Sequence, residues 1–245
     1  MSKNFVYGFH AIETLLKTRA QDVEKLLVCE RRNRRTGDIV QQAESLGIPV
    51  ERASRADLDR RSANANHQGL LAWVSPQAVH NEAFLKDLVL AEGSRIFLLV
   101  LDEIQDPHNL GACLRSADGA GVSAVLSPRR KCAGLTPAVR KVASGAAETV
   151  PLVQVGNLAR MLRWLAEQDV RIIGLCGDGE ASLYDTVLTG PLALVLGGEG
   201  KGLRRLTRDH CTTLAALPMR GAIESLNVSV AAGICLYEAL RQRMV

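Results

Sequence analysis

The chain has 245 residues, a formal net charge of +4, 47% hydrophobic residues and 23% charged residues. This is the composition of a folded globular protein, and the length suffices for one large or two small domains. No run of about 18 apolar residues occurs, which excludes a membrane-spanning helix. The N-terminus lacks the apolar core of a signal peptide, so we expect a cytoplasmic protein.

The six cysteines are scattered along the chain and never form a Cys-x-x-Cys pair. Most of them lie within apolar runs, which is typical of reduced core residues in a cytosolic protein. No Cys/His pair has the spacing of zinc ligands, so we expect no metal site.

The first 75 residues have the pattern of a small α/β unit. Apolar residues at helical spacing predict helices in YGFHAIETLLK and over residues 37–46, with Leu46 on the apolar face of the second. The runs VEKLLVCE and HQGLLAWV predict strands. Residues 76–93, which open at Pro76, predict a linker with one short helix.

Two basic clusters stand out against the small net charge. The run RRNRR contributes Arg31, Arg32, Arg34 and Arg35, and the run SPRRK ends at Lys131. Clusters of this kind suit a phosphate backbone, and each taken alone is also compatible with a solvated basic loop.

From residue 94 onward, near-continuously apolar runs alternate with helical patterns such as NLGACLRSADGAG and NLARMLRWLAEQ. The predicted strands are RIFLLVLD, VSAVLS, TVPLVQV, VRIIGLCG, PLALVLGG and TTLAALPM. Their continuous apolarity indicates burial on both faces, hence a mostly parallel sheet covered by helices. Ligands of such sheets bind beyond the carboxyl ends of the strands, so a site is expected in the loops after Asp102, Gly177, Gly197 and Leu217.

The loop GGEGKG, Gly197–Gly202, follows one of these predicted strands. It differs from a P-loop because Lys201 is followed by Gly202, which has no hydroxyl to bind Mg²⁺. Its glycines still allow the backbone to approach a ligand closely. The loop therefore predicts a ligand site but not an NTPase.

Two further stretches carry more polar groups than their helices require. In DPHNLGACLRSADGAG, Asn109 can cap a helix that begins at Leu110, and Arg115 lies off its apolar stripe. In GAIESLNVSVAAGICLYEAL, Ser225 or Asn227 can cap the helix that follows. For Asn109 and Arg115 taken singly, a cap or a solvated charge explains the residue as well as a function does.

In this order and at these separations, the stretches resemble the SpoU branch of the SPOUT methyltransferases. The matching motifs are DPHNLGACLRSADGAGV, LALVLGGEGKGL and LPMRGAIESLNVSVAAGICLYEAL. The resemblance implies an L30e-like RNA-binding domain over residues 1–75, a linker over 76–93 and a trefoil-knotted methyltransferase domain over 94–245. It also implies a homodimer formed through the C-terminal domain.

The implied reaction moves a methyl group from S-adenosylmethionine to the ribose 2'-hydroxyl of a guanosine in 23S ribosomal RNA, without a metal. The implied catalytic residues are Asn109, Arg115, Glu199, Ser225 and Asn227; the implied cofactor-binding residues are Gly177, Gly197, Leu217, Met219 and Leu226. The implied RNA-binding residues are those of RRNRR. The matched polar set gives no role to Glu224.

Two other functions remain open from the sequence. One is a 2'-O-methyltransferase acting on transfer RNA, against which the full-length similarity argues. The other is a non-catalytic RNA-binding protein, which would not need the intact set of polar residues.

Overall fold

The structure is a computed structural model that describes residues 4–29, 34–62, 64–75, 79–198, 200 and 202–244. Contacts divide the chain into two compact units. The first contains Met1–Ala78 and Leu135–Thr149, and the second contains Val79–Gly134 and Val150–Val245. The contact-based units differ from the contiguous ranges expected from the sequence, because Leu135–Thr149 groups with the first unit.

The first unit has a sheet in which the described strands follow the order β1-β4-β2-β3. Its elements are β1 (Asn4–Tyr7), α1 (Phe9–Thr18), a 3-10 turn (Ala20–Asp22), β2 (Val23–Cys29), α2 (Arg34–Ser45), β3 (Val50–Ala53), α3 (Arg55–Arg61) and β4 (Leu70–Val74). Strand β4 is antiparallel to β1 and β2, whereas β2 and β3 are parallel. Helices α1 and α2 bury Ile12, Leu15 and Ile39 in one core cluster with strand residues.

The predicted helices and strands of this unit are confirmed, with one correction. Leu46 is 47% exposed rather than buried, because α2 ends at Ser45 and Leu46 follows it in a turn. The sequence patterns did not indicate β1, β3 or α3, whose short lengths leave little periodicity to detect.

Two helices from the middle of the chain complete the first unit: α6 (Pro137–Ala143) and α7 (Ala146–Thr149). The Glu148 carboxylate is 1% exposed and pairs with Arg140 and, at 2.6 Å, with Nη1 of Arg19, the C-cap residue of α1. A Cβ atom on Gly145 would lie 2.3 Å from Oγ1 of Thr14. A buried ion triad and a close backbone approach therefore hold α7 against α1.

In the second unit, the described strands form one sheet in the order β7-β6-β5-β10-β8-β11-β9, and each pairing in it is parallel. The strands are β5 (Phe97–Asp102), β6 (Ala124–Pro128), β7 (Leu152–Val155), β8 (Arg171–Leu175), β9 (Ala181–Ser182), β10 (Leu192–Gly197) and β11 (Thr213–Ala216). The helices are α4 (Glu82–Glu92), α5 (Pro107–Gly119), α8 (Leu158–Glu167), α9 (Arg205–Arg208) and α10 (Val228–Arg243). The predicted parallel sheet is thus confirmed.

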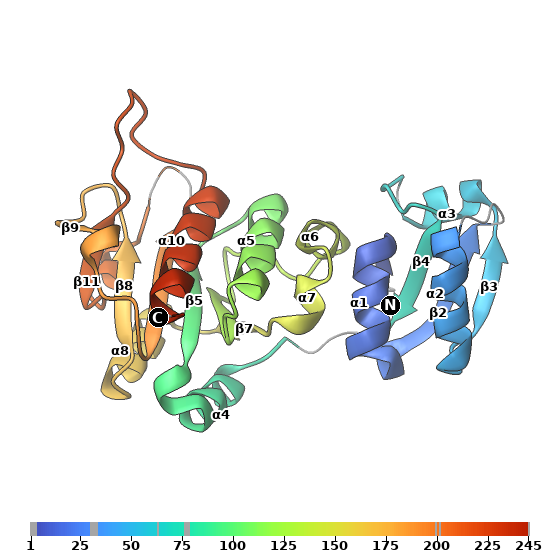
Figure 1. Cartoon of the computed structure of the whole chain (residues 1–245), viewed down its shortest axis with the longest axis horizontal. Helices are drawn as coiled ribbons and strands as arrows, with labels where there is room; N and C mark the ends of the chain where they lie inside the picture. The colour runs from blue at the N-terminus through green and yellow to red at the C-terminus, as the bar shows by residue number, and fades with distance from the viewer. Residues whose placement is uncertain are drawn as a thin grey trace. The chain divides into compact units, whose positions relative to one another are not determined.

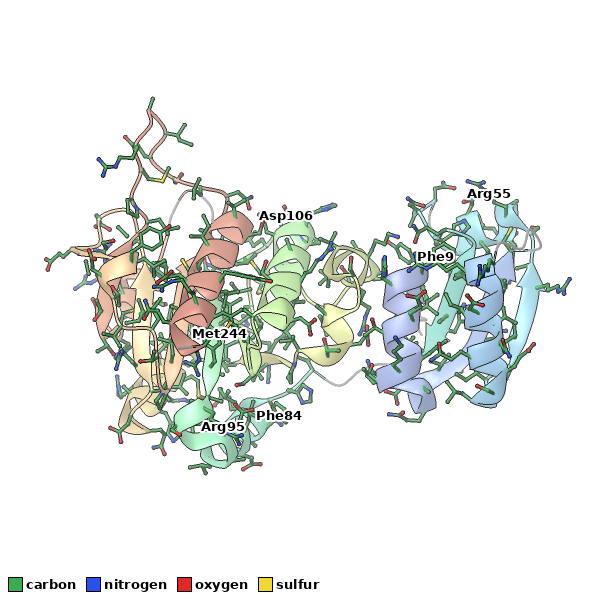
Figure 2. The ribbon with its side chains drawn as sticks, in the orientation of Figure 1. Phe9, Arg55, Phe84, Arg95, Asp106 and Met244 are labelled. Carbon is green, nitrogen blue, oxygen red and sulfur yellow. The ribbon has the colours of Figure 1, made fainter. Side chains whose placement is uncertain are left out.

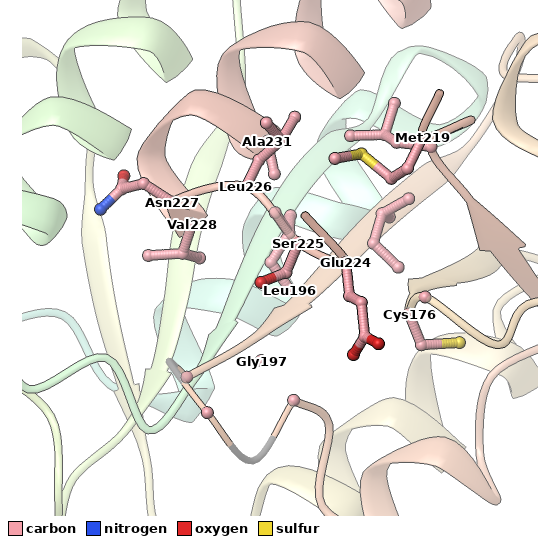
Figure 3. A pocket seen from close by; sticks show the side chains of 16 residues that line it. Cys176, Leu196, Gly197, Met219, Glu224, Ser225, Leu226, Asn227, Val228 and Ala231 are labelled. Carbon is pink, nitrogen blue, oxygen red and sulfur yellow. The ribbon is translucent and has the colours of Figure 1, made fainter. Parts of the chain in front are cut away.

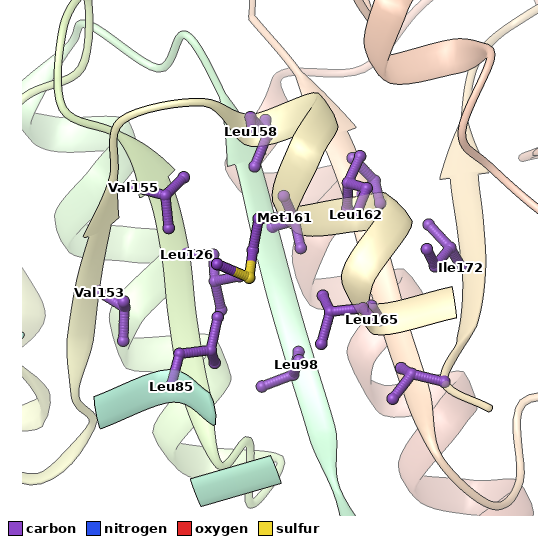
Figure 4. Close-up of a cluster of buried hydrophobic side chains, with 14 of the residues drawn as sticks. Leu85, Leu98, Leu126, Val153, Val155, Leu158, Met161, Leu162, Leu165 and Ile172 are labelled. Carbon is purple, nitrogen blue, oxygen red and sulfur yellow. The ribbon is translucent and has the colours of Figure 1, made fainter. Parts of the chain in front are cut away.

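Helices cover both faces of this sheet (Figure 1). Helices α4 and α8 place Leu85 and Met161 in one core cluster with Leu98 of β5 (Figure 4). Helices α5 and α10 pack together, and α10 also contacts β10. Leu98 and its neighbour Leu99 are both fully buried, which explains why the strands lack the alternation of a one-sided sheet.

The strand order places the carboxyl ends of β10, β8 and β11 next to one another. Chain segments that follow these strands can therefore contribute to one site. Among the described residues, no helix is both long enough and apolar enough to cross a membrane.

Candidate active site

A cavity of about 450 Å³ lies at the carboxyl ends of β8, β10 and β11. All the residues predicted to bind a cofactor line it: Gly177, Gly197, Leu217, Met219 and Leu226. We call it the strand-end cavity (Figure 3). The predicted site residues Ser225 and Asn227 also line it, as do Cys176 and Glu224.

The glycine-rich loop after β10 forms one wall of the strand-end cavity because it folds tightly on itself. A Cβ atom on Gly197 would lie 2.1 Å from the carbonyl carbon of Gly202. The amide of Gly202 donates to the carbonyl of Gly198 at 3.1 Å, which closes the turn. Glycine at position 197 is thus a steric requirement of this fold, as well as a means of exposing backbone to a ligand.

The start of α10 forms another wall of the cavity. Asn227 caps the helix, because its Oδ1 accepts from the amide of Ser229 at 2.9 Å. Its Nδ2 donates to Oδ1 of Asn109 at 3.0 Å, so two predicted site residues 118 positions apart are joined directly. The prediction that Asn227 can act as a cap is confirmed, and the same side chain also positions Asn109.

Asn109 is not a helix cap, which corrects the prediction. Helix α5 begins at Pro107, and Oδ1 of Asp106 caps it by accepting from the amide of His108 at 2.9 Å (Figure 2). Asn109 instead lies in the first helical turn, where it is 6% exposed. Proline suits the first helical position because the missing N–H would have no partner there.

A second cavity of about 750 Å³ adjoins the first and shares Gly198, Gly202 and Val228 with it. We call it the Asn109 cavity, since Asn109 lines it together with charged residues from three segments. The Asn109–Asn227 hydrogen bond therefore joins residues that line two neighbouring cavities.

A buried carboxylate fastens the loop between the two cavities. Asp102, at the end of β5, has a fully buried side chain and accepts from Nε of Arg204 at 2.8 Å and from Oγ1 of Thr207 at 2.7 Å. Both partners follow the glycine-rich loop in sequence. Asp102 was noted from the sequence only as a strand end, and its anchoring role depends on partners about 100 positions away.

Other predicted residues lie elsewhere. Arg115 is exposed on α5 and is not among the residues that line either cavity. Arg34 is exposed at the start of α2, whereas Arg35 pairs with Glu13 at 2.9 Å. Glu199, Arg31 and Arg32 lie outside the described residues.

Burial makes several of the cysteine thiols weaker acids, because it raises their pKa. Burial raises the pKa of Cys113 and of Cys235 to about 12, and it also raises the pKa of Cys176 in the wall of the strand-end cavity. A thiol with a raised pKa is a poor nucleophile at neutral pH. The described residues contain no group of three His, Cys, Asp or Glu side chains arranged to hold a metal ion.

Comparisons with known proteins agree with this architecture. The model of the SpoU rRNA Methylase family matches residues 96–237, and the model described as "RNA 2'-O ribose methyltransferase substrate binding" matches residues 5–79. The chain therefore belongs to the SpoU rRNA methylase family.

Two relatives are similar over nearly the whole chain. The 23S rRNA (guanosine-2'-O-)-methyltransferase RlmB of Photorhabdus laumondii is 50% identical, with 97% of this chain and 98% of the relative covered. The protein of the same name from Escherichia coli is 48% identical with the same coverage. Among solved structures, the SpoU methyltransferase AviRb from Streptomyces viridochromogenes in complex with AdoMet has a TM-score of 0.82 at 22% identity, covering 98% of this chain and 90% of that one. This last likeness concerns the fold.

Proposed function

We propose that this protein transfers a methyl group from S-adenosylmethionine to the ribose 2'-hydroxyl of a guanosine in 23S ribosomal RNA. The observation that carries the proposal is the convergence of the motifs on the strand-end cavity and the Asn109–Asn227 pair beside it. The two relatives named as 23S rRNA (guanosine-2'-O-)-methyltransferases, which match nearly the full length, support the choice of RNA.

The strand-end cavity fits the chemistry of S-adenosylmethionine. Leu196, Leu217 and Leu226 give it apolar walls for an adenine ring, and the glycine-rich loop brings backbone groups close. Glu224 adds a carboxylate to the lining, which can attract the cationic parts of the donor. When bound, the donor supplies an activated methyl group on a sulfonium sulfur.

The chain's own residues align the 2'-hydroxyl and stabilise the charge that develops on it. The Asn109 and Asn227 side chains are joined by a hydrogen bond, and Ser225 lines the same cavity as Asn227. We assign these three residues and Glu199 to positioning of the ribose and the donor. Arg115 stabilises the developing alkoxide or binds the adjacent phosphate, because a guanidinium keeps its proton and cannot act as a simple base.

The position of Arg115 supports a homodimer as the active form. Arg115 is exposed on α5, and the adjacent α10 carries Val230 and Tyr237, which are 50% and 53% exposed. Dimerisation through this pair of helices would cover the apolar side chains and allow Arg115 to act across the interface. A trefoil knot in the second unit and a cytoplasmic location complete the proposal.

The first 75 residues form the RNA-binding part of the proposed enzyme. A substrate-binding family model matches residues 5–79, and Arg34 presents an exposed cation at the start of α2. The linker over residues 76–93 and a methyltransferase domain over residues 94–245 follow in this proposal.

The test is methylation of unmodified total RNA with labelled S-adenosylmethionine in the presence of EDTA. We expect label in 23S ribosomal RNA at one mapped nucleotide. Label confined to transfer RNA would replace the proposed substrate, and donor binding without transfer to any RNA would support a non-catalytic RNA-binding protein.

A further inference from the structure

The Asn109 cavity differs in chemistry from the strand-end cavity. Besides Asn109, it is lined by the acceptor side chains of Glu103, Gln105 and Asp106 and by the cations Lys131 and Arg205. A bound nucleotide offers phosphates for the cations and base N–H groups for the acceptors. The two cavities share Gly198, Gly202 and Val228. A nucleotide in the Asn109 cavity would therefore lie next to S-adenosylmethionine in the strand-end cavity.

Glu103 occupies an unusual position in the wall of the Asn109 cavity. Its backbone is left-handed, with φ at 64°, and so is that of Lys131, with φ at 61°. Neither residue is glycine, and non-glycine residues held in this backbone conformation concentrate at functional sites. The ammonium group of Lys131 lies 3.4 Å from Oε1 of Glu103, so the two strained residues face each other.

The carboxylate of Glu103 is held in place but retains hydrogen-bonding capacity. Nη1 of Arg204 lies 3.1 Å from Oε1 of Glu103, and Arg204 is itself fixed by the buried carboxylate of Asp102. Within the described part of the chain, Oε1 is buried and accepts no hydrogen bond of good geometry. A buried polar atom without a hydrogen bond costs free energy, so a ligand that donates a hydrogen bond to the Glu103 carboxylate would be bound favourably.

Two exposed cations near Glu103 also suit a nucleotide. Lys131 is 68% exposed and Arg205 is 93% exposed, so both can turn toward phosphate groups. Arg204 remains beside Glu103 because Asp102 holds it. The carboxylate therefore keeps its orientation when Lys131 turns away from it.

We propose, on the basis of the proposed function, that the Asn109 cavity holds the target guanosine and that the Glu103 carboxylate recognises its base. Guanine presents N1–H and the 2-amino group as adjacent donors, which a carboxylate can accept together. Adenine presents an acceptor at N1, which a carboxylate repels. Enzymes that take one nucleotide of a nucleic acid into a pocket read its base by hydrogen bonds to this Watson–Crick edge. Glu103 is thus a specificity residue that lies outside the set of catalytic residues.

The test compares RNA fragments that carry guanosine or inosine at the mapped nucleotide, using wild type and Glu103→Gln. Inosine lacks the 2-amino group. We expect wild type to prefer guanosine by about ten- to hundredfold in kcat/KM, and Glu103→Gln to lose most of that preference. The affinity for S-adenosylmethionine should not change. Glu167→Gln, which removes an exposed carboxylate on α8, is the matched control and should keep the preference.

The ratio of two kcat/KM values does not depend on the fraction of folded enzyme, so a poorly folded variant still gives an answer. An unchanged guanosine-to-inosine ratio in Glu103→Gln would overturn the inference, whatever the loss of total activity. Loss of all methylation by wild type would instead contradict the proposed function.

Discussion

Arg115 is a proposed catalytic residue that lines neither of the two cavities of this chain. It is exposed on α5 and is not among the residues that line the strand-end cavity. We expect Arg115→Ala to lower the single-turnover rate of methylation by about a hundred- to a thousandfold, which is typical of losing a group that stabilises developing charge. Rapid-quench assays with labelled donor measure this rate.

The affinity for S-adenosylmethionine should stay unchanged in Arg115→Ala, since Arg115 does not line the donor cavity. Arg163→Ala, which removes an exposed arginine from α8, serves as the control. An unchanged single-turnover rate in Arg115→Ala with donor bound would show that Arg115 has no part in the reaction.

Asp102 is a structural residue with a functional consequence. Its buried carboxylate accepts from Arg204 and Thr207, which follow the glycine-rich loop. We expect Asp102→Asn to reduce the free energy of unfolding by about 2 kcal/mol, since hydrogen bonds to a charged group are lost. We also expect weaker binding of S-adenosylmethionine, because the loop after β10 loses its anchor.

Urea denaturation and calorimetric titration measure these two effects for Asp102→Asn. Asp87→Asn is a matched control, since Asp87 is exposed on α4. If Asp102→Asn and wild type have equal stability and equal donor affinity, Asp102 does not anchor the loop after β10.

At the scale of the element, the loop after β10 depends on close backbone contact. A Cβ atom on Gly197 would overlap the backbone of Gly202, so Gly197→Ala must shift the loop. We expect at least a tenfold loss of donor affinity, measured by calorimetric titration, with α-helix content retained in circular dichroism. In Gly134→Ala, by contrast, the added Cβ meets open space, and donor affinity equal to that of wild type is expected. A Gly197→Ala variant that binds the donor normally would contradict this steric argument.

The strands and helices of the second unit were predictable because their apolar runs are long and nearly unbroken. Runs such as RIFLLVLD and PLALVLGG are too short for a typical helix and are bounded by turn residues, which favours buried strands, and they form β5 and β10. The strand order was not predictable, because no local pattern encodes that β10 lies between β5 and β8. Helices α6 and α7 group with the first unit through contacts between residues far apart in the chain, such as the Arg19–Glu148 ion pair, and periodicity carries no information on such contacts.

The candidate site shows the same division. The motifs indicated Ser225 or Asn227 as a helix cap, and in the structure Asn227 takes that role. The motifs also suggested Asn109 as a cap, but Asp106 takes that role and Asn109 turns toward Asn227. The sequence indicated the loop after Asp102 as part of a site but singled out neither Asp102 nor Glu103, because their contacts are with partners about 30 to 100 positions away.

At the scale of the whole molecule, the proposed RNA-binding role of the first unit is separable from donor binding. Arg34 is exposed, whereas Arg35 forms an ion pair with Glu13, so Arg34 is the better position to alter. We expect Arg34→Glu to raise the KM for RNA several-fold and to reduce the salt dependence of binding by about one phosphate contact. Donor affinity should be that of wild type, and its loss would indicate misfolding of the variant instead.

The central claim is the transfer of a methyl group to a ribose oxygen of guanosine, and the identity of the modified nucleoside tests it most directly. Unmodified 23S ribosomal RNA is incubated with the protein and S-adenosylmethionine, digested to nucleosides and analysed by mass spectrometry. The account predicts 2'-O-methylguanosine at close to one per RNA molecule. A methyl group on a base, or on the ribose of another nucleoside, would contradict it.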